Sequence, residues 1–387
     1  MYKKITVGAF IASLVMFFAL IFIFPRDEMA QIKENRPLSE MPSVSISSIL
    51  SGEFMEKYEQ YLSDNVGFRS FFTDLGARIE GLRGITQGKD GQVITLANGS
   101  RLAVYRGKIM EIFRSDEAAK QAYINAINSY ADILPEKTNM YVMIVPTQIE
   151  FDNSQYATLS DDQKATIDSI YSSLTHAKGI DVYSKLAEHT DEYIYFRTDH
   201  HWTQRGAYYG YLAIAEKIGE KAIPITEMEK GKASGFLGYL YNQANIPDLA
   251  SSPDDIEYFI PGENYTLEAR ISEFGEIADY SARIYNIPKN AEEVRYAVFM
   301  GGDHPFAKIT TANKNGKCAL IIKDSYANAL IPLLTSHYET LLVIDPRSYY
   351  ASVTELFSEY EIDDLFVINY TVATILPSFI ESLEKIK

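Results

Sequence analysis

The short stretch Thr198-Asp199-His200-His201-Trp202 gathers the most reactive side chains in the sequence. It holds two of the six histidines and the only tryptophan. Asp199 and His201 are two residues apart, so in an extended segment both side chains leave the same face and the carboxylate can orient the imidazole ring. A histidine oriented in this way can act as a general base. The question is whether the pair serves a nucleophile, a metal or only the fold.

A candidate nucleophile, Ser325, follows the apolar segment 318–322. We expect that segment to be a strand of a parallel sheet, and ligands bind at the carboxyl ends of such strands. The free N–H groups at the start of a following helix can stabilise an oxyanion. Serine is a weak nucleophile and needs a base, itself oriented by a third group. The alternative is that Ser325 only caps the helix.

The two segments together predict a Ser-His-Asp triad. Asp199 would orient His201, and His201 would deprotonate Ser325. We expect both segments at strand ends of one sheet, so that the three side chains can meet in one cleft. Such triads recur in different orders on unrelated folds. His200 is an alternative base, but in an extended segment it faces away from Asp199.

A metal site is a second interpretation of the same stretch. Asp199, His200 and His201, with Asp303 and His304, would supply carboxylate and imidazole ligands. Phosphoesterases with an Asp-His-His element also carry further aspartate motifs, which we do not find in order. We therefore expect no metal and no cofactor. A third interpretation is that Asp199 and His201 form only a buried hydrogen-bonded pair.

The elements that must position these residues have the pattern of an α/β protein. Residues 140–145 are apolar on both faces, as in a buried parallel sheet. Strands alternating with helices predict such a sheet with helices on both faces. Further strands are expected at 180–183, 193–196, 318–322, 341–344 and 365–368. Helices are expected at 116–134, at 161–175 and after a capping Thr203, and two more between 51 and 75. We also expect a hairpin at 92–105 and an insertion with β-structure at about 221–315.

The N-terminal sequence predicts a membrane anchor. An uncharged run from Ile5 to Phe24 follows Lys3 and Lys4. About 20 apolar residues span a bilayer as a helix, whereas the apolar region of a secretory signal is shorter. The two lysines favour a cytoplasmic N-terminus. We expect an uncleaved anchor at 1–25, an extended stem at 26–50 and an extracytoplasmic domain at 51–387 on the cell membrane, with a cleaved signal peptide as the alternative.

The composition excludes several classes of function. A formal net charge of −16 makes the chain a poor partner for nucleic acid, which binds proteins mainly through cations. The single cysteine, Cys318, can form no internal disulfide and excludes four-cysteine zinc sites. With 47% hydrophobic residues the chain has the composition of a globular protein, not of a disordered one.

The segment Arg197-Thr198-Asp199-His200-His201-Trp202-Thr203 resembles the signature of the bacterial DHHW family. That family is similar to the SGNH-hydrolase-like O-acetyltransferases that modify alginate and other exopolysaccharides. The resemblance implies a three-layer α/β/α sandwich with a mostly parallel sheet, SGNH-hydrolase-like in permuted order. It implies that Asp199 orients, His201 is the base and Ser325 the nucleophile. Further segments resemble family blocks in the expected order: Glu34-Asn35-Arg36, Asp64-Asn65 with Phe68-Arg69, Asp324-Ser325-Tyr326 and Asp345-Pro346-Arg347.

The sequence also departs from the family pattern near the nucleophile. Lys323 stands where a glycine often precedes the Asp-Ser pair, and its side chain could narrow the approach to the oxyanion. The glycine and asparagine blocks that supply oxyanion donors in SGNH hydrolases are not evident. We expect the backbone N–H groups of Ser325 and Tyr326 to take this role, with Asn328 as the nearest side-chain substitute.

Two further residues are candidates for contact with a substrate. Arg347, at the end of an expected strand, could hold an anionic group of the substrate or a carboxylate of the protein. Trp202 could stack on a sugar, or pack beside the histidine and fix its orientation.

The resemblance implies an extracytoplasmic O-acetyltransferase. Ser325 would accept an acetyl group and pass it to a hydroxyl of an exopolysaccharide or cell-wall polysaccharide. Because acetyl-CoA is cytosolic, a multi-spanning membrane-bound O-acyltransferase would relay the acetyl group. One alternative is a polysaccharide O-acetyl esterase that uses the same triad. Another is a non-catalytic protein that binds polysaccharide or assembles an export machine.

Overall fold

The structure is a computed structural model that describes residues 41–44, 48, 53–65, 91–96, 99–244, 246–262, 265–273, 276–290 and 293–387. The described residues belong to two compact units, one of residues 1–89 with 242–246 and one of 90–241 with 247–387. The predicted anchor at 1–25, most of the predicted stem and the predicted helix around 68–75 lie outside the described residues. Within the described ranges, no helix has both the length and the apolar character needed to cross a membrane.

The first unit contributes one described helix, α4, over Glu53–Asp64. It forms where the sequence predicted the first of two helices. The Phe54 and Tyr58 rings, four residues apart, stack with their centroids 5.6 Å apart on one face of the helix.

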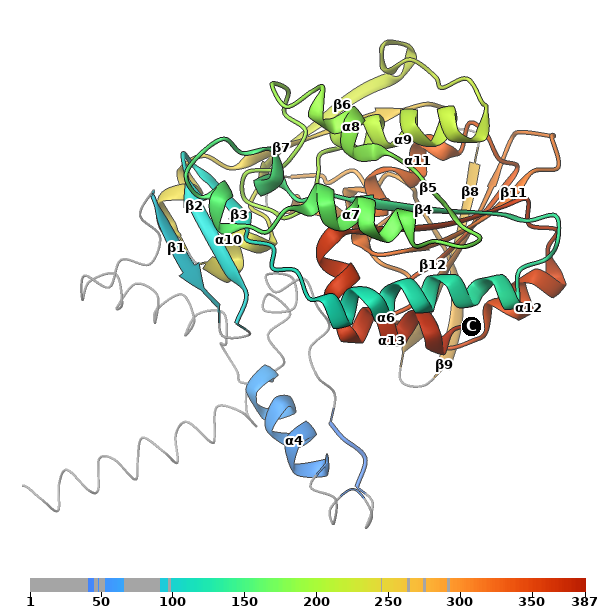
Figure 1. Cartoon of the computed structure of the whole chain (residues 1–387), viewed down its shortest axis with the longest axis horizontal. Coiled ribbons are helices and arrows are strands. Elements are labelled where there is room, and N and C mark those ends of the chain that lie inside the picture. The colour runs from blue at the N-terminus through green and yellow to red at the C-terminus, as the bar shows by residue number, and fades with distance from the viewer. Residues whose placement is uncertain are drawn as a thin grey trace, which may run out of the picture. The chain divides into compact units, whose positions relative to one another are not determined.

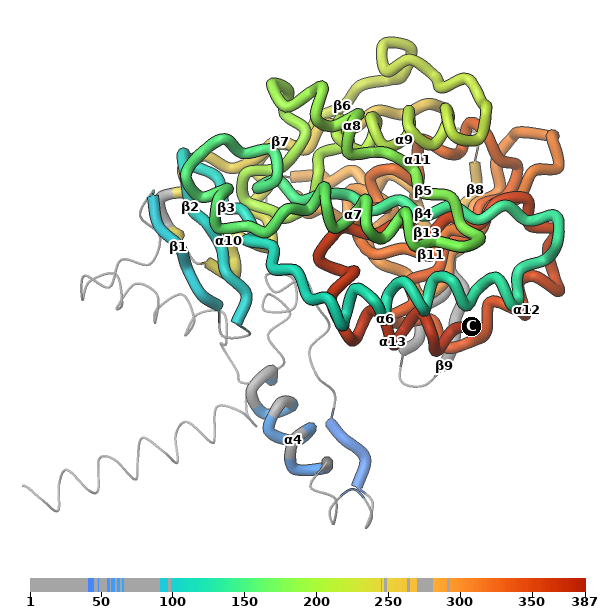
Figure 2. The backbone as a smooth tube through the Cα atoms, viewed as in Figure 1, coloured from blue at the N-terminus to red at the C-terminus, as the bar shows by residue number. Residues whose placement is uncertain are grey.

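The second unit is built on a central sheet. Among the described residues this sheet has eight strands in the order β5-β4-β13-β11-β12-β10-β8-β9. The first five are parallel to their neighbours and the last three are antiparallel. Figures 1 and 2 show β4 and β11 in the middle of the unit, between α9 and α6. The strands are β5 Lys178–Gly179, β4 Asn139–Val145, β13 Asp364–Tyr370, β11 Cys318–Lys323, β12 Thr340–Ile344, β10 Phe306–Thr311, β8 Tyr265–Glu273 and β9 Glu276–Ala282.

Helices cover both faces of this sheet, which explains why its central strands are apolar throughout. Alternate residues of β11 point to opposite faces, so Leu320 and Ile322 contact one set of helices and Ala319 and Ile321 the other. The first set comprises α6 Glu117–Asn128, α7 Gln163–Ser172, α12 Val353–Glu359 and α13 Pro377–Lys385. The second comprises α8 Val182–Ala187, α9 Gln204–Ile218 and α11 Ile331–Leu334. The result is a mixed α/β fold in three layers, with a large, mostly parallel sheet.

Two small sheets accompany the central one in the described part of the chain. β1 Gln92–Thr95, β2 Arg101–Tyr105 and β3 Lys108–Glu111 form an antiparallel meander. The predicted hairpin is confirmed, but β3 was missed. Arg106 and Gly107, with φ of 50° and 72°, form the tight turn before it, and an arginine is an uncommon residue in such a turn. β6 Glu229–Phe236 pairs with β7 Asp254–Ile260, and the short helix α10 covers Tyr239–Ala244.

The strands predicted at 140–145, 318–322, 341–344 and 365–368 are confirmed as β4, β11, β12 and β13. The strand predicted at 180–183 is wrong, because β5 ends at Gly179 and α8 begins at Val182. Asp181 starts that helix, since its side chain accepts the Ser184 N–H at 3.0 Å. Three strands of the segment 221–315, β8, β9 and β10, extend the central sheet.

The segment 193–196 is not a strand of the sheet. Its only ladder contact in the described structure is an isolated bridge between Tyr195 and Trp202. Asp199 and His201 therefore lie on a loop between α8 and α9, not at the end of a sheet strand as predicted. Thr203 ends the loop as expected, because its hydroxyl accepts the Gly206 N–H and caps α9.

Replacing Leu320 by alanine tests the central sheet. Leu320 is 0% exposed, so the change leaves a cavity, and we expect it to lower the free energy of unfolding by about 2–5 kcal/mol. Urea unfolding of the full-length chain in detergent, followed by the fluorescence of the single Trp202, measures this. Ile287→Ala, at a side chain that is 49% exposed, is the control and should change stability by less than about 0.5 kcal/mol. Equal effects of both changes would contradict the burial of β11.

Candidate functional site

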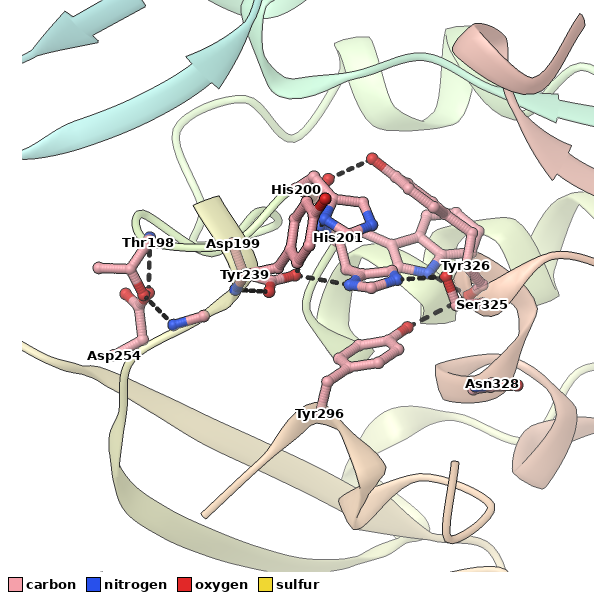
Figure 3. A network of polar contacts seen from close by, with 12 residues as sticks. Thr198, Asp199, His200, His201, Tyr239, Asp254, Tyr296, Ser325, Tyr326 and Asn328 are labelled. Atoms are coloured by element: carbon pink, nitrogen blue, oxygen red, sulfur yellow. Dashed lines mark hydrogen bonds and ion pairs between the residues drawn. The ribbon is translucent and has the colours of Figure 1, made fainter. Parts of the chain in front are cut away.

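Asp199, His201 and Ser325 form one hydrogen-bonded chain (Figure 3). Nδ1 of His201 lies 2.5 Å from Oδ1 of Asp199, and Nε2 lies 2.7 Å from Oγ of Ser325. Both ring nitrogens are thus engaged, one by an acid and one by a hydroxyl. Asp199 and His201 are 3% and 1% exposed, whereas Ser325 is partly exposed. This geometry allows the imidazole to remove the serine proton while the carboxylate stabilises the resulting imidazolium.

The Asp199 carboxylate is held by backbone groups as well as by the imidazole. Its Oδ1 atom accepts the His201 N–H at 2.9 Å, and its Oδ2 atom accepts the Tyr239 N–H at 2.7 Å. Gly238 makes the second bond possible, because a Cβ atom there would lie 2.2 Å from the Asp199 Cβ. Burial alone raises the pKa of Asp199, but the charges of His201 and His200 and these hydrogen bonds lower it below its usual value. The carboxylate is therefore ionised at neutral pH.

A second buried carboxylate, Asp254 at the start of β7, holds the loop that carries Asp199. Its Oδ2 atom accepts the Thr198 N–H at 2.8 Å and the Thr198 hydroxyl at 2.6 Å. Its Oδ1 atom accepts Nε of Arg197 at 2.9 Å. Asp254 is 0% exposed. Sequence reasoning missed this residue, because it is a single aspartate in a segment without clear periodicity.

Aromatic rings fix the orientation of the His201 ring. The Tyr296 ring stacks on it at a centroid distance of 3.7 Å and an interplanar angle of 6°, and the His200 ring lies 3.9 Å away. Tyr296 is one of 28 tyrosines, and nothing in the sequence distinguished it from the others. Trp202 is 0% exposed, so it cannot stack on a sugar. Its Nε1–H donates to the Tyr326 carbonyl at 2.8 Å. This bond joins the loop that carries His201 to the turn Ser325–Ala329, which we call the serine turn.

The turn that carries Ser325 excludes the alternative role of Ser325 as a helix cap and differs from the prediction in its oxyanion donor. Asp324, not Ser325, caps the 3₁₀ turn Ser325–Ala329, because its Oδ1 atom accepts the Tyr326 N–H at 3.0 Å. Asp324 also accepts the Tyr370 N–H at 2.9 Å, and burial raises its pKa to about 7. The Tyr326 N–H is thus already bonded and is not the oxyanion donor that we expected. Among the described residues the Ser325 N–H has no acceptor, and it remains available.

A network of charges lies behind the serine turn. The Lys323 ammonium, 1% exposed, donates to Asp303 and, at 3.4 Å, to Asp345. The Arg347 guanidinium donates to Asp345 through Nε at 2.8 Å and to Asp303 at 2.9 Å. Arg347 therefore holds carboxylates of the protein, the second of its two predicted roles. The side-chain amide of Asn328 donates to Asp303 at 2.8 Å, so this donor is also in use.

The metal interpretation receives little support from the donor atoms. One ligand atom from each of Asp199, His200 and His201 lies within 4.8 Å of the others. Both carboxylate oxygens of Asp199 and both nitrogens of His201 already have hydrogen-bond partners. The other predicted ligands do not join this group in the described structure. Asp303 belongs to the charge network, and His304 bonds through Nε2 to the Met300 carbonyl at 2.6 Å.

Gly238→Ala tests the support of Asp199. The added Cβ must displace Asp199 or the Tyr239 N–H, so we expect the reaction of Ser325 with phenylmethanesulfonyl fluoride to slow at least tenfold. Mass spectrometry of the labelled protein measures the rate. Gly262→Ala is the control, because a Cβ at Gly262 meets no atom within 4 Å. Unchanged labelling in the Gly238 variant would show that the close approach does not matter.

His200 gives the site a pH dependence. Burial lowers its pKa to about 4 from 6.5, so between these values the unfolded chain binds a proton that the folded chain does not. Stability then falls as the pH falls from 6.5 to 4, by up to about 3 kcal/mol for this residue. Urea unfolding of the wild type and of His200→Gln across this range measures the effect as a difference. Contributions from His304 and His337 are the same in both proteins and cancel. If the stabilities of the wild type and of His200→Gln changed with pH in the same way, the lowered pKa of His200 would be contradicted.

Comparisons with known proteins agree with this description. A family model described as DHHW protein matches residues 97–344. A crystal structure of a DHHW family protein from Eubacterium siraeum has 27% identity and a TM-score of 0.67, and the match covers 76% of this chain and 98% of that one. Bacillus cereus PatB1, solved with a sulfonyl adduct, has 20% identity and a TM-score of 0.62 over 72% of this chain and 97% of that one, which indicates a shared fold. The O-acetyltransferase domain of Pseudomonas putida AlgJ has 14% identity and a TM-score of 0.42, and the match covers 77% of this chain and 100% of that one. No curated protein sequence matches the chain.

Proposed function

Because the chain belongs to the DHHW protein family, we propose that it is an O-acetyltransferase that moves an acetyl group through Ser325 to a hydroxyl of a polysaccharide. The observation that carries the proposal is the continuous contact from Asp199 through His201 to Ser325, with distances of 2.5 Å and 2.7 Å. The SGNH-hydrolase-like fold in permuted order, which the resemblance implies, is part of this proposal.

The first half-reaction loads the serine. Nε2 of His201 takes the proton of Ser325 as Oγ attacks the acetyl carbonyl carbon, and Asp199 stabilises the imidazolium. The Ser325 N–H is the available backbone donor for the oxyanion. His201 then gives its proton to the leaving group, and Ser325 carries the acetyl ester.

The second half-reaction reverses these steps with the acceptor. His201 removes the proton of an acceptor hydroxyl, whose oxygen attacks the acetyl carbon, and Ser325 leaves with the proton from His201. Water can replace the acceptor, which makes the protein an esterase. A transferase therefore needs an acceptor that is bound in place before the attack. The resemblance of the Arg197–Thr203 segment to the DHHW family, which is similar to polysaccharide O-acetyltransferases, favours transfer over hydrolysis.

The location and the acetyl donor are further parts of the proposal. An anchor at 1–25 would hold the domain at the outer face of the cell membrane. Acetyl-CoA is cytosolic, so a multi-spanning membrane-bound O-acyltransferase would bring the acetyl group across the membrane. The acceptor would be an exopolysaccharide or cell-wall polysaccharide. The net charge of −16 supports the absence of a nucleic-acid partner.

Acetyl transfer can be measured directly. We expect the full-length protein in detergent to release the alcohol from a chromogenic acetyl ester, to carry acetyl on Ser325 and to acetylate an added oligosaccharide. Ser325→Ala and His201→Ala should each reduce the rate by about 10³-fold or more, because each removes a group that the chemistry needs. Mass spectrometry follows both the protein and the sugar.

Ser358→Ala is the matched control, since Ser358 is exposed on α12. Ester cleavage that never yields acetylated sugar would replace the transferase by the esterase. Full activity of the Ser325 and His201 variants would leave only a non-catalytic role.

A further inference from the structure

Four buried polar side-chain atoms have no hydrogen-bond partner in the described part of the chain. They are Oε2 of Glu111, Oε1 of Gln148, Nδ1 of His200 and Oδ1 of Asn328. A buried polar atom without a partner is destabilising, so folded proteins rarely leave one unless a ligand or water meets it. Two of these four residues, Glu111 and His200, act on each other electrostatically.

Glu111 lies beside the Asp199 loop. It is the last residue of β3, and β3 is bonded to the loop through the Ile109 N–H and the Arg197 carbonyl at 2.8 Å. Burial raises the pKa of the Glu111 carboxyl above its usual value. No described residue donates a hydrogen bond to this carboxyl. A buried carboxyl oxygen such as Oε2 of Glu111 needs a hydrogen-bond partner to compensate its loss of hydration.

His200 lies beside the reacting groups and interacts electrostatically with Glu111. Its ring centroid is 3.9 Å from that of His201 and 5.4 Å from that of Tyr239 (Figure 3). The ring is neutral at neutral pH, so it offers one acceptor and one donor nitrogen. Its Nδ1 atom is 3.9 Å from Oδ1 of Asp199, too far for a hydrogen bond. The side chain as a whole is 15% exposed, so a ligand can reach part of the ring, although Nδ1 itself is buried.

We propose that Glu111 and His200 form the acceptor subsite and bind neighbouring hydroxyl groups of a neutral saccharide. The inference rests on the proposed function, because it takes Ser325 as the carrier of the acetyl group. Glu111 accepts a hydrogen bond from one hydroxyl and the His200 ring bonds to another, which leaves a third hydroxyl beside Nε2 of His201. The acceptor O–H proton goes to His201, the oxygen bonds to the acetyl carbon, and Oγ of Ser325 leaves with that proton.

The charges at this subsite select the class of sugar. The ionised Asp199 carboxylate repels a second carboxylate, and the Glu111 carboxyl offers it no compensating cation. The cations of the serine turn, Lys323 and Arg347, are bound to Asp303 and Asp345. A uronic acid therefore finds repulsion here, whereas a neutral sugar supplies the hydroxyl donors that the unpartnered atoms need.

Saccharide binding tests the subsite without catalysis. In the full-length Ser325→Ala protein, isothermal titration calorimetry at low salt would compare cellotetraose and chitotetraose with tetragalacturonate. We expect a neutral tetrasaccharide to bind at least tenfold more tightly than the uronate. Glu111→Gln, which keeps the shape of the side chain, should weaken binding of the neutral tetrasaccharide about tenfold and narrow its advantage over the uronate, because an NH₂ donor replaces one acceptor oxygen. His200→Gln provides a second variant if the first does not fold, as judged by thermal unfolding.

Glu188→Gln is the matched control, since Glu188 is exposed at the end of α8. In the Ser325-containing protein, the ratio of sugar acetylation to Ser325 acetylation should fall in the Glu111 variant and not in the control. Tighter binding of the uronate, no binding of either neutral sugar, or an unchanged affinity in both subsite variants would overturn this proposal. Failure of Ser325 to become acetylated would instead reject the proposed function, and the binding result would still decide the subsite.

Discussion

The burial of the Asp199 carboxylate is the constraint on which the site depends. A charged group at 3% exposure is tolerated only if hydrogen bonds replace its lost water. The chain supplies these from three directions: the His201 ring, the His201 backbone and the Tyr239 backbone. Gly238 lets the last of these approach, because any side chain there would occupy the space of Asp199. The same bonds that compensate the charge also fix the imidazole against Ser325, so stability and geometry have one origin.

Further acids surround this centre, and all but one are compensated by other groups of the chain. Asp254 is bonded by Thr198 and Arg197, and Asp324 by two backbone N–H groups. Asp303 and Asp345 are neutralised by Lys323 and Arg347. Glu111 alone among these acids has neither a cation nor a donor from the described residues. Because the other acids are matched within the fold, we place the proposed acceptor subsite at the uncompensated one, where a substrate would contribute the missing hydrogen bonds.

The fold was predictable where burial on both faces leaves a local trace in the sequence. The continuous apolar runs of β4, β11, β12 and β13 reflect helices on both sides, and their positions were predicted to within a residue or two. Short segments carry no such trace. Residues 180–183 and 193–196 are apolar and β-like, but one starts a helix and the other makes a single bridge. Their conformation depends on the Asp181 cap and on the loop held by Asp254, which local periodicity does not report.

For the site, the sequence by itself determined the chemical types: an acid and an imidazole two residues apart, and a serine after a buried strand. Together with the resemblance to the DHHW family, these types predicted which side chains would meet, although 124 residues separate His201 from Ser325 and the expected strand end at Asp199 is absent. Only the tertiary structure decided what holds and surrounds them. Tyr296, Asp254, Gly238 and Glu111 come from distant segments, and each has an ordinary local sequence. Their importance lies in a stacking distance, a buried oxygen or a missing Cβ, which exist only once the chain has folded.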